Sequence, residues 1–299
     1  MKIISIFILI VVIIATAFSE LYLKNLGLGD PIRYDSNYIY GYAPKENQKK
    51  RRIKGAKVTI NDIGLRSVNS WKESNKDKIL FLGDSITYGG SYIDDTETFS
   101  YLVCKKIQKY ICGNAGVNAY SIINIVMRSK YDKRFNDAKK YIFLVAPGDF
   151  YRQYADSQTA HFYLNNHKFF LPAIMEAISF FATKYDINRY ISKKNDTENY
   201  QHKKELIKFS IDFLNNEIKR LEDKNKSVYL FYTVEKNDKE SKTKLNSYIL
   251  NEIKRLNLNN FYTLKKILKD NTSFYDNVHY SKKGHKLVSE EIIKILKNN

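Results

Sequence analysis

From Lys78 onward, short apolar runs alternate with segments of helical periodicity, and this alternation limits the fold of the 299-residue chain more than any other feature. Apolar runs this short are typical of strands buried on both faces of a parallel sheet. The predicted strands are 79–82, 110–112, 141–145, 227–232 and 261–264. The predicted helices are 98–110, 121–129, 205–223, 240–256 and 281–296. The alternation predicts an α/β fold, a three-layer α/β/α sandwich around a parallel five-stranded sheet with right-handed crossovers.

The N-terminus predicts the compartment. Residues 3–18 carry no charge, and residues 1–23 are interpreted as a signal anchor or a signal peptide. Ala15-Thr16-Ala17 fits a cleavage site, but an uncleaved anchor is favoured. With Lys2 on the cytoplasmic side, the rest of the chain faces the periplasm or the exterior. We therefore expect a single-pass protein of the inner or cytoplasmic membrane, or a secreted one if the signal is cleaved.

Charge does not identify a partner. Fifty Lys and Arg residues against 32 Asp and Glu give a net charge of +18, which would suit an anionic partner. The basic residues are spread along the chain among acidic ones, and no nucleic-acid-binding motif accompanies them, so no nucleic-acid partner is predicted. Residues 24–76 are expected to form an N-terminal extension with short strands. Within it, 56–60 is interpreted as an exposed strand and the basic run 49–52 as a solvated turn, with contact to anionic headgroups or glycan as the alternative.

Two features allow two interpretations each. An insertion at about 150–203 interrupts the alternation, and it contains His161, His167 and His202. It forms either a lid or substrate wall or an extra packing helix. Cys104 and Cys112 form either one disulfide or two buried thiols.

The strongest local signal is Gly83-Asp84-Ser85-Ile86-Thr87-Tyr88-Gly89, directly after the first predicted strand. A serine at the end of a strand and the start of a helix lies where backbone N–H groups favour a developing negative charge. The flanking glycines allow a tight turn and a close approach of substrate. Because a serine hydroxyl is a weak nucleophile alone, a base is needed elsewhere in the chain.

The candidate base lies near the C-terminus. Asp276 and His279 are three residues apart on one predicted loop, so the carboxylate can orient the imidazole. Ser281 is a plausible cap for the terminal helix. An Asp-x-x-His pair alone is a weak signal, but together with the serine motif it becomes fairly specific.

These motifs resemble those of the SGNH/GDSL hydrolase family, and the resemblance covers roughly Val58 to the C-terminus, including the lead-in 60–66. It implies an SGNH hydrolase-like domain at 77–299 with a flavodoxin-like sheet, no cofactor and no metal. It also implies ester hydrolysis or O-acyl transfer, often on cell-surface carbohydrate. By this likeness Ser85 is the nucleophile, His279 the general base and then acid, and Asp276 the residue that orients it.

Two positions depart from the family pattern. Ala119 stands where the oxyanion glycine is expected, although its backbone N–H can still donate. Gly148 stands where an asparagine would donate to the oxyanion from its side chain. Loss of one such donor costs about 10²–10³ in rate. The backbone N–H groups of Ser85, Ala119 and Gly148 remain as oxyanion donors, and Asn118 or a group from the insertion is a possible substitute for the missing side chain.

The resulting hypothesis is an exported serine esterase that acts on O-acyl esters, chiefly O-acetyl esters, of cell-surface carbohydrate. The alternatives are an O-acetyltransferase with the same triad and a catalytically weakened glycan-binding protein of the same fold. A metal set drawn from His279, His285 and Asp276 lacks a further acidic cluster, so no metal site is predicted. Asp84 and Asp149 are expected to brace the site loops, and Trp71 to pack in the interior.

Overall fold

The structure is a computed structural model that describes residues 2–73, 75–158, 171–184, 198–236 and 240–298. Its centre is a five-stranded parallel sheet in the order β6-β5-β7-β8-β9. The strands are β5 (Asp77–Gly83), β6 (Tyr110–Asn114), β7 (Lys140–Val145), β8 (Ser227–Tyr232) and β9 (Phe261–Thr263). Every predicted strand is present, and the order is the flavodoxin-like one.

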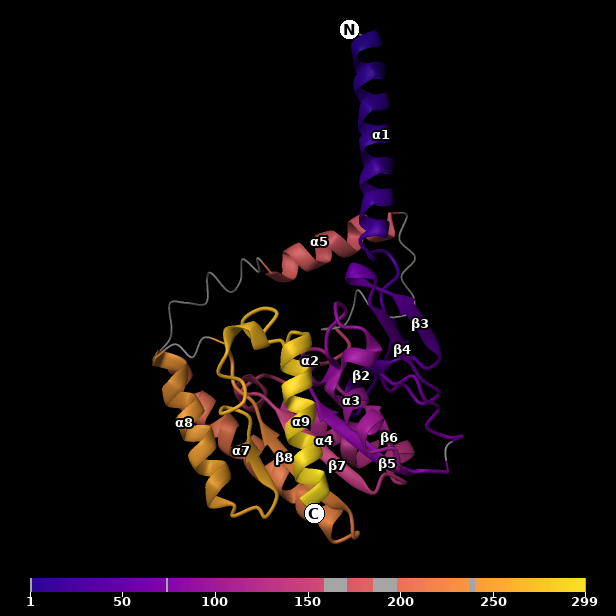
Figure 1. The fold of residues 1–299 in the computed structure, drawn as a ribbon. Coiled ribbons are helices and arrows are strands. Elements are labelled where there is room, and N and C mark those ends of the chain that lie inside the picture. The colour runs from indigo at the N-terminus through magenta and orange to yellow at the C-terminus, as the bar shows by residue number, and fades with distance from the viewer. Residues whose placement is uncertain (1, 74, 159–170, 185–197, 237–239, 299) are drawn as a thin grey trace.

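Helices cover both faces of the sheet, which confirms the predicted three-layer sandwich (Figure 1). On one face, α3 (Phe99–Lys106) and α9 (Lys282–Asn298) pack against each other and bury Val103 and Ile292. On the other face lie α4 (Ile122–Tyr131), α7 (Glu198–Glu222) and α8 (Glu240–Arg255), which bury Ile125, Ile211 and Ile249. The strands between these layers are apolar on both sides, as a sheet buried on both faces requires.

The N-terminal extension forms two antiparallel pairs, β1 (Tyr34–Asn37) with β2 (Gly41–Pro44) and β3 (Gln48–Arg51) with β4 (Lys57–Ile60). The expected solvated turn at the basic run is wrong, because most of that run is strand β3. Arg52, the last residue of the run, follows β3 and is buried and ion-paired with Glu176. The strand predicted at 56–60 is present, but one of its faces is buried through Val58 and Ile60.

The first helix, α1 (Lys2–Asn25), rises from the folded body as a separate rod (Figure 1). The segment Ile3–Asn25 contains an 18-residue window with a mean hydropathy of 2.6, which is apolar enough for a signal sequence or a membrane anchor. Large apolar side chains along it are exposed, for example Phe7 and Phe18. A core helix of a globular protein would bury such residues.

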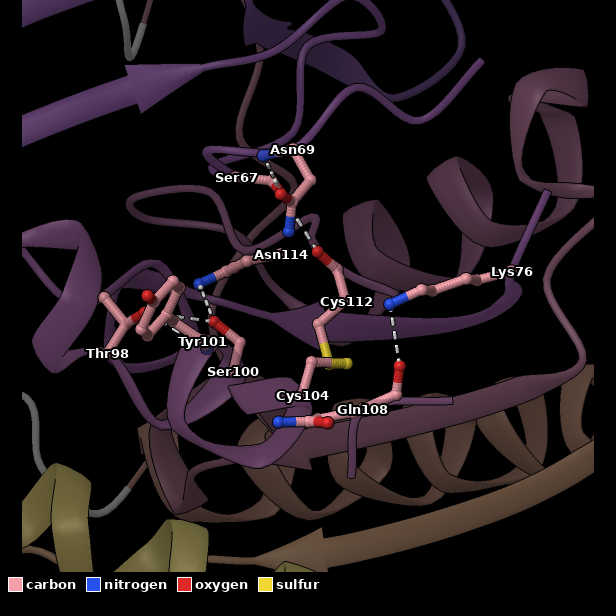
Figure 2. The surroundings of a disulfide bond; sticks show 10 residues. All are labelled: Ser67, Asn69, Lys76, Thr98, Ser100, Tyr101, Cys104, Gln108, Cys112 and Asn114. Atoms are coloured by element: carbon pink, nitrogen blue, oxygen red, sulfur yellow. Dashed lines mark hydrogen bonds between the residues drawn. A yellow bond between two sulfur atoms is a disulfide. The ribbon is translucent and has the colours of Figure 1, made fainter. Parts of the chain in front are cut away.

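Cys104 on α3 and Cys112 on β6 form a disulfide, which decides between the two predicted states of these residues (Figure 2). Trp71 is buried, as predicted, and its indole donates to Asp137 at 2.9 Å. The described part of the insertion contains α5 (Pro172–Lys184), which packs against α1. That contact favours the packing-helix interpretation for α5, whereas His161 and His167 lie outside the described residues.

Short helices complete the chain. The four-residue α2 (Ser85–Tyr88) follows β5 directly. Single 3₁₀ turns occur at Ile53–Gly55, Asp95–Glu97, Lys133–Phe135, Pro147–Phe150 and Asn271–Ser273. Two of these elements, α2 and the turn at Pro147–Phe150, follow the carboxyl ends of adjacent strands, where ligands of open α/β sheets bind.

Candidate active site

Ser85 is the first residue of α2, at the carboxyl end of strand β5, which lies between β6 and β7 in the sheet. Asp84 caps this helix by accepting a hydrogen bond from the Ile86 backbone N–H at 2.8 Å. A side chain at Gly83 would collide with Thr87 Oγ1 at 2.1 Å and the Leu144 carbonyl at 2.4 Å, so only glycine fits below the turn. The cap and the close packing together fix the position of the serine hydroxyl, which is half-buried.

The loop before α9 brings the predicted base to this hydroxyl. His279 Nε2 lies 2.9 Å from Ser85 Oγ, and His279 Nδ1 lies 2.7 Å from Asp276 Oδ2. The Asp276 carboxylate also accepts the backbone N–H groups of Val278 and His279, each at 2.8 Å, which closes the loop around it. Ser281 accepts from the Gly284 N–H and so caps α9, as predicted. The three predicted residues therefore form one hydrogen-bonded chain.

The electrostatics of this chain suit proton transfer. Burial raises the pKa of Asp276, but hydrogen bonds from the His279 ring and from two backbone N–H groups lower it to about 2. Burial lowers the pKa of His279, but the hydrogen bond and charge of Asp276, with a further contribution from Asp84, raise it above its ordinary value of 6.5. Asp276 therefore stays ionised at neutral pH, and it favours the imidazolium that forms when His279 accepts a proton.

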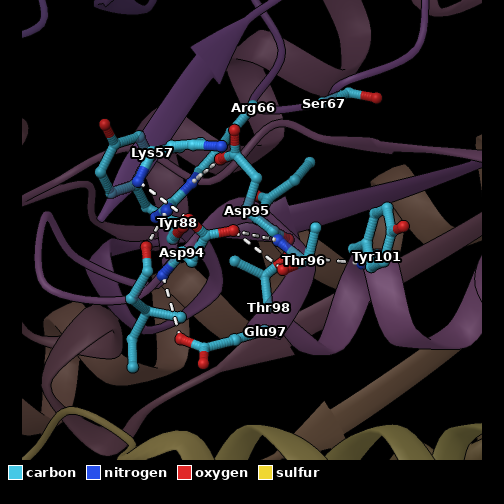
Figure 3. A network of polar contacts seen from close by, with 12 residues as sticks. Lys57, Arg66, Ser67, Tyr88, Asp94, Asp95, Thr96, Glu97, Thr98 and Tyr101 are labelled. Atoms are coloured by element: carbon cyan, nitrogen blue, oxygen red, sulfur yellow. Dashed lines mark hydrogen bonds and ion pairs between the residues drawn. The ribbon is translucent and has the colours of Figure 1, made fainter. Parts of the chain in front are cut away.

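A buried arginine braces the segment that follows the serine. Arg66 donates to the carbonyls of Tyr88 at 2.8 Å and Gly90 at 2.6 Å, and it pairs with Asp95 at 3.1 Å. The neighbouring Asp94 accepts from the Lys57 N–H at 3.0 Å (Figure 3). Arg66 belongs to the lead-in 60–66, so this part of the motif has a structural role: it ties the N-terminal extension to the end of α2.

The loop from Asn114 to Ala119, which contains the first of the two departures from the family pattern, packs directly beneath α2. A side chain at Gly116 would meet the Tyr88 nitrogen at 2.3 Å, so the loop contacts the backbone of α2. Ala119 has φ +63°, a left-handed conformation that glycine adopts more easily. In the described part of the chain the backbone N–H groups of Ser85 and Ala119 donate no hydrogen bond. Both donors are therefore free for a ligand.

The segment 146–149, which contains the second departure at Gly148, supplies an acidic residue but no amide side chain. Asp149 is fully buried and braces its loop by accepting the Ala146 N–H at 2.9 Å. Burial and the nearby charge of Asp84 raise the pKa of Asp149 well above its ordinary value. A Cβ on Gly148 would have one near neighbour among the described residues, Arg152 Nη2 at 3.5 Å. An arginine thus borders the position that the family pattern gives to asparagine.

Arg152 lies at the site although no sequence motif indicates it. Its Nη1 lies 3.6 Å from Asp84 Oδ2 and 3.3 Å from Asp149 Oδ1, and it donates to the Tyr120 carbonyl at 2.7 Å. The sequence feature that could have indicated it is its position, since Arg152 is a cationic residue three positions after Asp149, at the start of the insertion. Neither Asn118 nor the described part of the insertion beyond Arg152 has a polar contact with these site residues.

Metal binding has no support in the described residues. No group of three or more His, Cys, Asp or Glu side chains in that part of the chain is arranged to hold an ion. His285, the remaining member of the set considered from sequence, is fully buried between Phe99 and Tyr280. It accepts the Phe99 N–H at 3.2 Å, and burial lowers its pKa to about 3, so it is a neutral core residue.

Comparison with known proteins gives structural similarity only. No protein-family model and no curated protein matches the sequence. The chain is similar to a solved G-D-S-L family lipolytic protein from Desulfitobacterium hafniense, with TM-score 0.46 and 12% identity over 74% of this chain and 99% of that one. It is also similar to a catalytic mutant of an acetylxylan esterase from Geobacillus stearothermophilus, with TM-score 0.47 and 14% identity over 73% and 93%. A lipase/acylhydrolase from Enterococcus faecalis has TM-score 0.44 and 14% identity over 74% and 96%.

Proposed function

We propose that this chain is an SGNH-type serine esterase that cleaves O-acyl esters, chiefly O-acetyl esters, of carbohydrate. The observation that carries the proposal is the hydrogen-bonded chain from Asp276 through His279 to Ser85, with distances of 2.7 Å and 2.9 Å. A hydroxyl, an imidazole and a carboxylate in this order are the parts that nucleophilic acyl transfer needs.

In the proposed reaction, Ser85 Oγ forms a bond to the ester carbonyl carbon while its proton passes to His279 Nε2. The carbonyl electron pair moves onto oxygen, and the resulting oxyanion accepts hydrogen bonds from the Ser85 and Ala119 N–H groups. Collapse of this intermediate breaks the bond to the alcohol oxygen, which takes the proton from His279. Water, deprotonated by His279, then hydrolyses the acyl-enzyme. Asp276 stays ionised throughout and stabilises the imidazolium.

An aromatic surface beside the catalytic loop supports a carbohydrate substrate. Tyr275, directly before Asp276, exposes 47% of its surface and stacks on Tyr92 with ring centroids 3.8 Å apart. Sugar rings have apolar faces that can pack on such rings, and the Tyr92 hydroxyl is fixed by its hydrogen bond to the Tyr280 carbonyl at 3.2 Å. We expect Tyr275→Ala to raise KM for an acetylated oligosaccharide and to leave KM for a small aromatic acetate unchanged.

We further propose that α1 anchors the protein in the membrane and that the catalytic domain faces the periplasm or the exterior. The support is the exposed apolar surface of α1, and the charge of Lys2 favours a cytoplasmic N-terminus. The disulfide between Cys104 and Cys112 also suits an oxidising compartment.

A covalent probe tests the activity. The full chain in detergent is treated with a fluorophosphonate probe, and the labelled residue is found by peptide mass spectrometry. We expect labelling at Ser85, loss of labelling in Ser85→Ala and strongly slowed labelling in His279→Ala. Ser281→Ala is the matched control, because Ser281 is a helix cap and its loss should leave labelling intact.

A wild-type protein that folds but neither labels nor hydrolyses an acetyl ester contradicts the esterase proposal and favours the glycan-binding alternative. Incubation of the acyl-enzyme with an oligosaccharide distinguishes hydrolysis from transfer, since a transferase would produce the acetylated sugar rather than free acetate.

A further inference from the structure

We propose that the Arg152 guanidinium donates to the oxyanion in place of the asparagine side chain that Gly148 lacks. This inference rests on the proposed esterase activity. The motif that ends at Asp149 lacks a side-chain donor at position 148, yet a cationic group borders the space that such a side chain would fill. Nη2 of Arg152 lies 3.5 Å from where a Cβ on Gly148 would be.

The guanidinium and the nucleophile contact the same carboxylate oxygen. Arg152 Nη1 lies 3.6 Å from Asp84 Oδ2, and Ser85 Oγ lies 3.5 Å from that same oxygen. Asp84 precedes Ser85 in the chain and is buried, so this oxygen does not move freely. Arg152 and the hydroxyl that attacks the substrate are therefore both positioned by the same buried oxygen.

The arginine is held in place and still has hydrogen atoms to donate. Its contacts with Asp84, Asp149 and the Tyr120 carbonyl all involve Nη1. Among the described residues no hydrogen bond uses Nη2, and a guanidinium has five N–H donors in a fixed plane. The side chain is 36% exposed, so its free edge can reach a bound ester. A donor that is fixed before the reaction starts is what transition-state stabilisation requires.

The local charges leave the cation effective. Burial and the charge of Asp84 both oppose ionisation of Asp149 and raise its pKa, so they weaken the negative charge that faces Arg152 at that carboxyl. The same positive charge opposes protonation of His279, so it also favours the neutral base before the reaction.

Three variants test the role: Arg152→Met, Gly148→Asn, and the two combined. Removal of one oxyanion donor lowers kcat by about 10²–10³, and we expect this loss in Arg152→Met with little change in KM. Position 148 has room for a side chain in the Arg152→Met background. Among the described residues, the only group within 4 Å of a Cβ at that position is the Arg152 guanidinium, which the methionine removes. We therefore expect the combined variant to have a kcat at least tenfold higher than that of Arg152→Met alone.

The rescue separates a catalytic role from a structural one. If Arg152 only balances Asp84 and Asp149, then asparagine at position 148 restores neither rate nor stability, and the proposal is wrong. If Arg152 binds an anionic group of the substrate, then KM rises for acidic esters alone and kcat is unchanged, which also contradicts it. Thermal unfolding of all three variants shows that each is folded. If the wild-type protein hydrolyses no ester, the esterase function itself is contradicted. If the wild type hydrolyses esters and Arg152→Met does so at the same rate, only the role of Arg152 is contradicted.

A separate set of contacts concerns α5. The N-terminus of α5 is attached to the end of α1 by Glu20, whose carboxylate accepts the N–H groups of Ala173 at 3.1 Å and Ile174 at 3.0 Å. One turn later, Glu176 accepts the Gly29 N–H at 2.6 Å and pairs with buried Arg52. These contacts are buried and charged, so they fix α5 across the end of α1 (Figure 1).

We infer that α5 lies in the lipid–water interface of the membrane that α1 crosses. This second inference rests on the proposed anchor. Figure 1 shows α5 running crosswise at the end of α1, between that helix and the body of the domain. A helix in this place is at the level of the headgroups if α1 spans the bilayer. Met175 and Ile178 on α5 are 37% and 54% exposed, and apolar side chains on an interfacial helix insert into lipid.

The surface next to α5, at the end of α1, is also apolar and exposed. Leu21, Tyr22 and Leu26, at the end of α1, are exposed. A hollow of about 550 Å³ lies between α1, α5 and the turn at Ile53–Gly55, and its lining is mainly apolar with Arg51 and Lys54 among its residues. Apolar side chains with adjacent cations match acyl chains and lipid phosphates.

Depth-dependent quenching tests this placement. The full chain is reconstituted in phosphatidylcholine–phosphatidylglycerol vesicles that contain nitroxide-labelled acyl chains, and an environment-sensitive fluorophore is attached at Ile178→Cys or Met175→Cys. The native cysteines are paired with each other and do not compete for the label. Lys297→Cys is the control, because it is exposed at the far end of α9, opposite α1 (Figure 1). We expect quenching at 178 and 175 and none at 297.

Two outcomes contradict the inference. Protein that floats with the vesicles but shows no quenching at 175 and 178 has an anchor and no interfacial α5. Protein that does not float lacks the anchor, and the inference fails with it. Neither result bears on ester hydrolysis, which is measured separately in detergent.

Discussion

The two sides of the candidate site differ in how closely they follow the family pattern. On the nucleophile side, Ser85, His279 and Asp276 match the expected residue types, and they form a continuous hydrogen-bonded chain. On the oxyanion side, alanine and glycine replace the expected residues at 119 and 148, and an arginine lies beside the gap.

The difference follows from chemistry. A nucleophile, a base and an orienting carboxylate each need one kind of functional group, so these positions tolerate few replacements. An oxyanion needs only N–H donors at the right distance, and backbone amides or an arginine can supply them as well as asparagine. Departure on the oxyanion side is therefore compatible with activity, whereas loss of a group on the nucleophile side is not.

The largest expected effect is on the nucleophile side. Ser85→Ala and His279→Ala should each lower kcat by about 10⁶, and the double variant should be no slower than either one, because the two groups act as a unit. Initial rates with a small acetyl ester measure this. Additive losses would show that serine and histidine act in separate steps.

Asp276→Asn should lower kcat by about 10⁴, because the amide can hold the wrong imidazole tautomer. The change should also shift the pH profile. In the wild type Asp276 raises the pKa of His279, so kcat/KM rises with pH through a value above 6.5. Without the carboxylate the pKa of His279 falls, and the acidic limb moves to lower pH. If the acidic limb of the kcat/KM profile lies at the same pH in Asp276→Asn as in the wild type, a group other than His279 controls it.

On the oxyanion side, the disulfide fixes the strand that leads to the Gly116–Ala119 loop. It joins α3 to β6 across eight residues of sequence, and removing a loop constraint of this size costs about 2–3 kcal/mol of unfolding free energy. We expect the double change Cys104→Ser and Cys112→Ser to lower stability by this amount, measured by urea unfolding, with kcat at 25 °C within threefold of wild type. A much larger loss of rate would show that the bridge positions the oxyanion loop.

The sequence alone predicted the fold and the Asp276–His279 pair, because both depend on local signals, whereas the contact of His279 with Ser85, 194 residues away, was expected only from the family resemblance. Buried strands have short apolar runs, and the Asp276–His279 pair closes through contacts within four residues. Tertiary contacts were harder to predict. Arg52 was expected in a solvated turn because it belongs to a run of basic residues, yet its partner, Glu176, is 124 residues away. Arg152 is adjacent to a recognised motif, but only the fold shows that its side chain turns back towards Gly148.

The smallest expected effect concerns Ala119, and it separates conformation from chemistry on the oxyanion side. At φ +63° an alanine carries about 1–2 kcal/mol of steric strain, whereas glycine in its place loses about 0.5–1 kcal/mol more conformational entropy on folding. The strain is larger, so Ala119→Gly should stabilise the protein by about 0.5–1 kcal/mol. The backbone N–H remains, so kcat should stay within about twofold of wild type.

Urea unfolding and initial rates measure the two effects of Ala119→Gly on the same sample. Ala115→Gly is the control, because Ala115 is buried on the same motif and has no positive φ, so glycine there should only destabilise. A gain in stability with an unchanged rate would show that alanine at 119 changes the strain of the loop and leaves its donor in place. A gain in rate of tenfold or more would show instead that the alanine holds its N–H away from the oxyanion, so that the departure at position 119 is a functional loss for which Arg152 alone does not compensate.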